Sequence, residues 1–302
     1  MDIRKGVVFA LIAALISGVS VFVNASAVKL SDPFAYTVVK NLGALVFIFS
    51  SLFLIKERKS LILLPSSKIL SLIAIGLIGG SVPFLMFFYG LSLGGAVVSS
   101  FIYRSLFIFA AVFGYFVLKE TPSRNDLIAG FAILIGNSFL ISGSLIFGMG
   151  QMLVLGATIL WALEYTISRK VMSDVPPKIV MFARMFFGSL ILLPYLLITN
   201  PQSLFSLNST IFSWLIITSL LLFGFIHFWY NSIKHLPILR ASIILSLGGI
   251  ISASLDVLFL HKSLSVFEAF GLLLILGGVI LSVSLSNLVE LLSLASQSKS
   301  SD

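Results

Sequence analysis

Ten apolar stretches, each long enough for a membrane-spanning helix, divide this chain of 302 residues. They lie at about 6–28, 34–55, 69–91, 95–118, 127–144, 150–171, 178–198, 209–233, 237–260 and 267–287. A helix of about 22 residues spans roughly 33 Å, which is enough to cross the hydrocarbon core of a bilayer. In that core only helices and closed barrels satisfy the backbone, and these stretches are too long and too uniformly apolar for barrel strands. The sequence therefore predicts an all-α integral membrane protein with ten transmembrane helices.

The composition excludes several other classes of protein. Hydrophobic residues make up 59% of the chain and charged residues only 10%, too few for the surface of a soluble protein of this length. The net charge of +8 could indicate nucleic acid, but the basic residues lie in short loops between apolar stretches, so no nucleic-acid partner is expected. Cysteine is absent, and no Walker loop, HExxH motif or potassium-filter sequence occurs. Neither a metal nor a cofactor is expected, and the oligomeric state is left open.

The distribution of Lys and Arg predicts the orientation in the membrane. With a cytoplasmic N-terminus, 14 of these residues fall on the inner side, including Lys56, Arg58 and Lys59. The outer loops then hold only Lys29 and Lys262, which places both termini in the cytoplasm and the protein in the cell membrane. The N-terminus also has features of a signal peptide, but its apolar run is longer than usual, so a retained first helix is expected.

Two parts of the chain share one plan. In residues 6–40 and 150–184 an apolar run is followed by a polar loop with a proline, Pro33 or Pro177, and seven residues later by a cation, Lys40 or Arg184. Five helices per half is an odd number, so the second half enters the membrane from the opposite side, as in an inverted repeat. The expected organisation is a first repeat over 1–148, a second, inverted repeat over 149–290, and a polar cytoplasmic tail over 291–302.

Several stretches resemble one known family. "FFYGLSLGGAVVSSFIY", "GYFVLKETPS" and "GFAILIGNSFLI" in the first half, and "FWYNSIKHLPILRASIILSL" with "LFLHKSLSVFEAFGLLLILGGVILS" in the second, occur in the order typical of the drug/metabolite transporter superfamily, EamA type. Glu120 stands where that family usually has a glutamate. Lys262 stands near where a second glutamate is common, and the proline often found within helices 4 and 9 is missing. With the ten apolar stretches counted in chain order, the resemblance implies a cavity between the first to fourth and the sixth to ninth. The fifth stretch, 127–144, and the tenth, 267–287, are then expected to lie outside it.

Five ionisable residues lie inside apolar stretches, where an unpaired charge costs several kcal/mol and marks a candidate functional site. Glu164 and Arg184 are expected at comparable depth, as a gating pair, a substrate clamp or a purely structural ion pair. Arg104 lies near the midplane, too deep to reach the interface, and is expected as a cavity cation. Lys40 and Asp256 lie nearer the outer ends of their helices, so each has a gating role or simply reaches water.

Polar residues at helical spacing predict a shared lumen. Ser17, Ser20 and Asn24 form a stripe on the first helix, and their repeat counterparts are Trp161, Glu164 and Ser168. The expected substrate-binding residues are Arg104, Glu164, Tyr89, Trp161, Tyr230, Asn231, Asn24, Ser17 and Ser246. The expected gating or ion-pair residues are Lys40, Arg184, Asp256 and His227. Close helix packing is an equally good explanation for the small residues among them.

Two prolines lie within apolar stretches. Pro83 and Pro194 each remove the backbone hydrogen bond to the carbonyl four residues earlier, that of Gly79 or Leu190. Both prolines are therefore expected to permit kinks, which are tolerated in a membrane where other groups satisfy the freed carbonyl.

These observations predict a secondary transporter rather than an enzyme. It is expected to move an amino acid or an organic anion or zwitterion by alternating access, as an exporter or exchanger. If transport is coupled to protons, Glu164 is the expected protonation switch. Two other classes use the same buried charges and stay open: an integral membrane enzyme or lipid-handling protein, and a sensor that binds the metabolite without transporting it.

Overall fold

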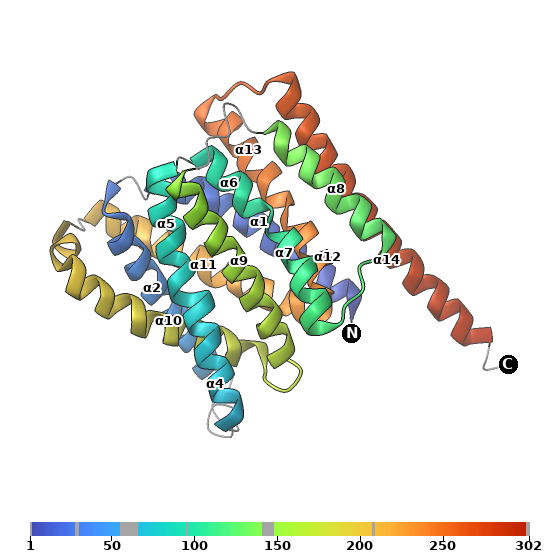
Figure 1. The fold of residues 1–302 in the computed structure, drawn as a ribbon, viewed down its shortest axis with the longest axis horizontal. Helices are drawn as coiled ribbons and strands as arrows, with labels where there is room; N and C mark the ends of the chain where they lie inside the picture. The colour runs from blue at the N-terminus through green and yellow to red at the C-terminus, as the bar shows by residue number, and fades with distance from the viewer. Residues whose placement is uncertain are drawn as a thin grey trace.

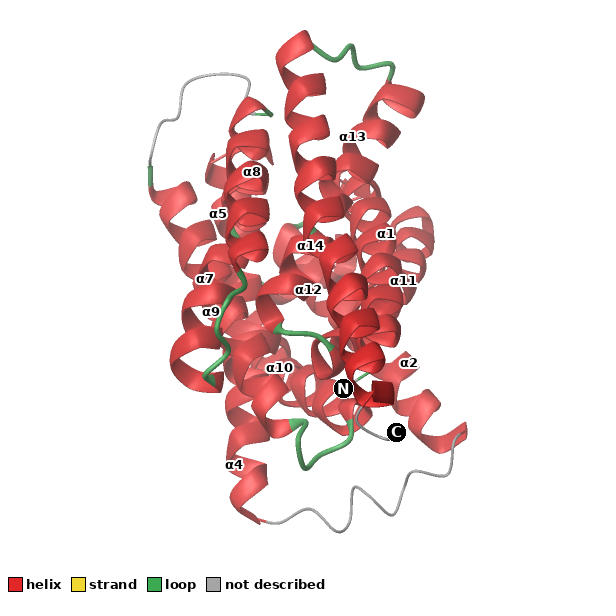
Figure 2. Cartoon of the chain, turned by 90° about the vertical axis from the view of Figure 1, so that its right-hand side faces the viewer, coloured by secondary structure: helices red, strands yellow, loops and turns green. Residues whose placement is uncertain are grey.

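The computed structural model describes residues 2–27, 30–54, 66–94, 96–140, 148–206 and 209–299, and all regular structure in these ranges is helical (Figure 2). The first part of the chain forms α1 (Ile3–Ala27), α2 (Pro33–Leu54), α4 (Ser66–Ile75), a π-helical turn (Gly76–Ser81), α5 (Val82–Gly94), α6 (Ala96–Arg104), α7 (Leu106–Phe113), a second π-helical turn (Gly114–Leu118) and α8 (Arg124–Phe139). The second part forms α9 (Met149–Val171), α10 (Pro177–Thr199), a 3₁₀ turn (Pro201–Ser206), α11 (Ser209–His235), α12 (Ile238–Leu245), α13 (Leu247–Leu260) and α14 (Val266–Lys299).

Among the described residues, nine helical segments are long and apolar enough to cross a membrane. They correspond to nine of the ten predicted stretches. The remaining stretch, 127–144, overlaps α8, whose 16 residues fall short of a full span, while residues 141–147 lie outside the described part of the chain. The inner-loop cations Lys56, Arg58 and Lys59 also lie outside it. At the C-terminus α14 continues to Lys299, so much of the predicted polar tail prolongs the last helix.

Matching local chemistry begins α8 and α14. Ser123 accepts a hydrogen bond from the backbone N–H of Asp126, and Ser265 accepts one from that of Glu268. Such N-cap bonds satisfy backbone donors that the first helical turn leaves unpaired, and at α14 Glu268 completes a capping box by accepting from the backbone N–H of Ser265. The two helices then pack side by side at one edge of the molecule (Figure 1). A Cβ atom at Gly136 would lie 2.6 Å from the carbonyl oxygen of Gly271, so only glycine permits this approach.

The start of α1 and the end of α14 lie toward the same end of the bundle, and the α13–α14 connection lies at the opposite end (Figure 2). Ion pairs cluster at the end that holds the termini. Lys68 at the start of α4 contacts Asp174 in the α9–α10 loop, and Arg240 of α12 lies 3.0 Å from Asp126 of α8. Hydrophilic contacts thus join several helices where the chain leaves its apolar stretches.

Candidate functional site

Two helices are interrupted at a serine. Ser105 separates α6 from α7, and Ser246 separates α12 from α13. The backbone N–H of Ser246 bonds to the carbonyl of Ile243, three residues earlier, and the Ser105 hydroxyl donates to the carbonyl of Ile102 over 2.6 Å. Both serines thus lie in a tightened turn within a longer apolar run.

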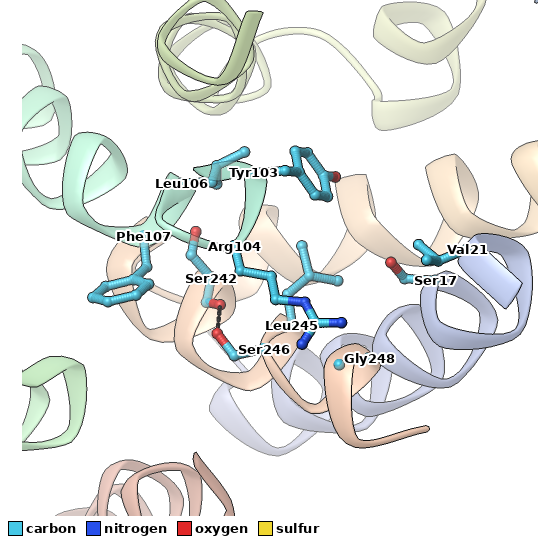
Figure 3. A pocket seen from close by; sticks show the side chains of 11 residues that line it. Ser17, Val21, Tyr103, Arg104, Leu106, Phe107, Ser242, Leu245, Ser246 and Gly248 are labelled. Carbon is cyan, nitrogen blue, oxygen red and sulfur yellow. Dashed lines mark hydrogen bonds between the residues drawn. The ribbon is translucent and has the colours of Figure 1, made fainter. Parts of the chain in front are cut away.

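A pocket lies between these interruptions and α1. Its lining residues come from both parts of the chain (Figure 3): Ser17, Val21, Tyr103, Arg104, Leu106, Phe107, Ser242, Leu245, Ser246, Gly248 and Gly249. The space amounts to about 460 Å³ with its open mouth included. Three predicted binding residues, Ser17, Arg104 and Ser246, therefore meet in one pocket. No described residue of α8 or α14 lines it, in agreement with the outer position that the resemblance implies.

Arg104 supplies the charge of this pocket. Its guanidinium extends from the end of α6 toward α13 (Figure 3), where a Cβ atom at Gly249 would lie 2.4 Å from Nη1. Glycine at this position makes room for the guanidinium. Of the described carboxylates, Asp256 exerts an attraction on Arg104, but none forms a salt bridge with it. Arg104 is thus a cation whose donors face a pocket.

Glu164 lies in a different environment, a closed cluster within the bundle. Its Oε1 atom accepts hydrogen bonds of 2.5 Å from the hydroxyls of Ser168 and Tyr230. Its Oε2 atom lies 3.6 Å from Nε of Arg184. Both charged residues are almost completely buried, at 0% and 1% exposure. The predicted proximity of Glu164 and Arg184 is therefore confirmed, and Tyr230 joins them.

Pro83 explains how Arg184 is held. Because proline has no N–H, the carbonyl of Gly79 receives no helical hydrogen bond, as the sequence predicts. It accepts instead from Nη2 of Arg184 and from the indole N–H of Trp161, each over 3.1 Å. Gly79 lies in the π-helical turn before α5, and a Cβ atom there would lie 2.3 Å from Cγ of Glu164. The third membrane-spanning segment, Lys68–Leu91, is interrupted at this turn and thus binds both α9 and α10. In α10 Pro194 lies inside a helix that continues to Thr199.

Aromatic rings connect the wall of the Arg104 pocket to the surroundings of the buried pair. Trp161 packs against Phe84, Phe87 and Tyr103, with ring centroids 5.3–5.5 Å apart. Tyr103 also lines the pocket, whereas Trp161 does not. Tyr103 of the pocket thus contacts Trp161, whose indole binds the same Gly79 carbonyl as Arg184, while Glu164 does not line the pocket.

Lys40 is buried without an acid. Its exposure is 4%, and Nζ lies 3.3 Å from the amide oxygen of Asn24. The ammonium faces the Phe88 ring at 4.8 Å, and Tyr36 donates to the same Asn24 oxygen over 3.2 Å. No described carboxylate forms a salt bridge with Lys40. Arg184, its counterpart in the second half, does have an acidic neighbour.

The remaining predicted residues are more dispersed. Tyr89 is 48% exposed and packs near Phe34, so it lies neither in the Arg104 pocket nor in the Glu164 cluster. The Asn231 amide donates to the carbonyl of His227 in its own helix, over 2.7 Å. The ring of His227 packs near two phenylalanines, Phe223 and Phe228. A substrate role for these residues stays a prediction. The described residues contain no group of three metal ligands.

Several pocket residues do not stand out in the sequence. Tyr103 is an ordinary aromatic residue in an apolar stretch, and Phe107 and Leu245 are typical lipid-facing types. Ser242 could have been predicted from the sequence, because it lies four residues before Ser246 and so on the same helical face. The sequence also identifies the carbonyl of Gly79 as one that loses its helical hydrogen bond. Its partners on α9 and α10 could be identified only from the fold.

A bundle of long apolar helices, able by length and composition to cross a membrane, defines a multi-pass membrane protein. The sequence model of the EamA-like transporter family matches residues 4–142 and again residues 148–284. The chain belongs to this family, which confirms the resemblance seen in the sequence. A search of curated proteins finds no match. A crystal structure described only as that of a protein superposes with a TM-score of 0.76 at 15% identity, over 93% of this chain and 98% of the other, which shows a shared fold.

Proposed function

We propose that this protein is a secondary transporter of the cell membrane that moves a small metabolite with an anionic group through the Arg104 pocket. The observation that carries the proposal is an arginine without a salt-bridge partner among the described residues, facing a pocket whose lining comes from both family repeats. An ionisable residue at this depth requires a partner, and a substrate anion can provide it.

The proposed architecture is ten transmembrane helices in two inverted five-helix repeats, with both termini in the cytoplasm. Three observations support it. The family model matches twice, the start of α1 and the end of α14 lie toward one end of the bundle, and a serine N-cap begins both α8 and α14. In such a fold one half rocks against the other around a fixed site, and the direction proposed is export or exchange.

The Glu164–Arg184 pair is proposed to stabilise the closed arrangement of one side. It joins α9 to α10, and the Gly79 carbonyl connects both to the third span. Opening this side would have to move the pair as a unit or expose it to water. If transport is coupled to protons, protonation of Glu164 would remove the charge that holds Arg184.

The test of the transport proposal is flux in liposomes that contain the purified full-length chain. We expect uptake from a panel of radiolabelled carboxylates and phosphate esters, and a loss of at least about tenfold for Arg104→Met, because a charge-assisted bond to the substrate is removed. Lys234→Met removes an exposed cation of α11 and is the matched control. Flux through Arg104→Met equal to that of the wild type would reject the proposal.

A sensor or an enzyme gives different results in the same assay. A sensor would bind a panel compound without moving it across the liposome membrane, and an enzyme would release a modified product. The coupling role of Glu164 is tested separately with Glu164→Gln, which is expected to abolish flux or its dependence on pH. Unchanged pH-dependent flux in this variant would contradict the switch.

A further inference from the structure

The Arg104 pocket has an unequal charge balance. Among its lining residues Arg104 is the only ionisable group apart from the Tyr103 phenol, and none is a carboxylate. Two lining hydroxyls already donate to backbone carbonyls, that of Ser242 to Ile238 and that of Ser246 to Ser242. These oxygens can accept a hydrogen bond, but they carry no charge to balance a cation on the substrate.

No described carboxylate lines this pocket. Of the 11 Asp and Glu residues in the chain, only Glu164 and Asp256 lie within the interior of an apolar stretch. Glu164 accepts from Ser168 and Tyr230, faces Arg184 and does not line the pocket. Asp256 lies two helical turns beyond Gly249 on α13, about 10 Å along the helix axis.

This spacing matters because the ammonium and carboxylate groups of an α-amino acid are attached to the same carbon atom. If its carboxylate binds Arg104, its ammonium group stays within the same pocket, whose described lining residues include no carboxylate. The ammonium group would then lose water without gaining a counter-charge, which is costly for a buried ion. A substrate without that group avoids the cost, and a second negative charge would likewise lack a second cation.

We propose that the pocket selects small organic monoanions, monocarboxylates with an apolar body, over zwitterionic amino acids of the same shape. This inference rests on the proposed transport function and narrows its substrate class. The single guanidinium binds the carboxylate, and the apolar body lies against Val21, Leu106, Phe107 and Leu245 (Figure 3).

Matched ligand pairs test the selectivity directly. The purified full-length chain is heated with propionate or alanine, and with 3-phenylpropionate or phenylalanine, so that each pair differs only by the ammonium group. We expect the carboxylic acid of at least one pair to raise the melting temperature in a saturable way, with an affinity at least about tenfold higher than that of the matching amino acid. Arg104→Met should abolish the shift, whereas Lys234→Met should retain it.

A second variant tests the cause of the selectivity. Ser17→Asp adds a carboxylate to the pocket wall, and Ser17→Asn adds a neutral group of similar size. The ratio of acid affinity to amino-acid affinity should fall at least about tenfold in Ser17→Asp relative to Ser17→Asn, because only the former offers a counter-charge.

The inference and the transport proposal can fail independently. Equal shifts for the two members of a pair, larger shifts for the amino acids, or no shift with any of the four ligands would overturn the inference. None of these results rejects the transport proposal, which fails if Arg104→Met leaves liposome flux unchanged.

Discussion

Three cations inside apolar stretches have three different environments. Arg184 faces Glu164 at 3.6 Å, Lys40 has an amide oxygen and aromatic rings, and Arg104 faces a pocket. The same formal charge therefore has a different consequence at each position. Loss of Arg184 leaves a buried carboxylate without its cation, whereas loss of Lys40 leaves no acid unpaired.

This difference predicts unequal effects on stability. Arg184→Met is expected to destabilise the protein by about 3–5 kcal/mol, because an unpaired charge stays buried at Glu164. The double variant Arg184→Met/Glu164→Leu should recover much of that loss. Lys40→Met is the matched control and should have a smaller effect. Thermal unfolding in detergent measures all three, and an equal loss for Arg184→Met and Lys40→Met would contradict the assignment.

Gly249 makes room for Arg104, which a single methyl group can test. Gly249→Ala places Cβ 2.4 Å from the present position of Nη1 and should displace the guanidinium, with a loss of flux of about tenfold or more. The control is Gly277→Ala in α14, where nothing lies within 4 Å of an added Cβ. That change should leave flux unaltered and stabilise the helix by about 0.5–1 kcal/mol. Equal fluxes for the two variants would show that Gly249 does not position Arg104.

At the scale of the helical elements, an interruption of a helix leaves backbone groups without their usual helical hydrogen bonds. Those groups can then bind side chains. The sequence predicts the change at Gly79 from Pro83, but it contains no proline at the interruptions of the fourth and ninth spans. There, Ser105 and Ser246 produce short turns within apolar runs. A serine inside a helix is usually compatible with continuity, so the sequence alone did not predict these interruptions.

The start of α8 offers a prediction on pH, because Asp126 precedes the apolar stretch. Burial there disfavours the carboxylate, but hydrogen bonds from Arg240, Ser123 and Ser282 outweigh it and lower the pKa of Asp126. A carboxylate with a lowered pKa stabilises the folded protein above its unfolded pKa of about 3.9, and this contribution disappears as the pH falls through the folded pKa.

The variant Asp126→Asn should therefore be less stable than the wild type by about 1–3 kcal/mol at neutral pH. The difference in melting temperature should stay constant down to about pH 5 and shrink below about pH 4. Ser138→Ala changes an exposed hydroxyl on the same helix and should give a difference that does not vary with pH. A constant difference for Asp126→Asn would contradict the proposed ionisation.

At the scale of the whole molecule, the bundle should separate a water-accessible face from a lipid-facing one. The chain has no cysteine, so single cysteines can be introduced without background labelling. Ser17→Cys in the pocket should react with a charged, membrane-impermeant reagent. Ile280→Cys is exposed at the outer surface of α14 and should not react, because lipid covers that surface. Equal labelling at the two positions would contradict the assignment of the pocket as a lumen.

Much of the helical organisation could be predicted from the sequence because spanning segments have to be long and apolar. Nine of the ten stretches are confirmed as helices of sufficient length. The contact of Glu164 with Arg184 was also predictable, because a short loop brings two successive helices together. The sequence did not predict that Ser17 and Glu164, on matching stripes of the two repeats, would have different environments: Ser17 lines the pocket, whereas Glu164 binds Tyr230 and faces Arg184. Sequence spacing assigns a residue to a face of its helix but does not identify the neighbour that covers it.

The sequence by itself determined a membrane protein of two related halves, because the bilayer requires internally satisfied helices and the family pattern occurs twice. It also determined which ionisable residues would be costly to bury. Only the tertiary structure decided which of them are paired. Contacts between distant helices place Arg184 beside Glu164, place Lys40 beside an amide, and leave Arg104 facing a pocket. Pairing depends on side-chain geometry across helices, which the pattern of a single helix does not contain.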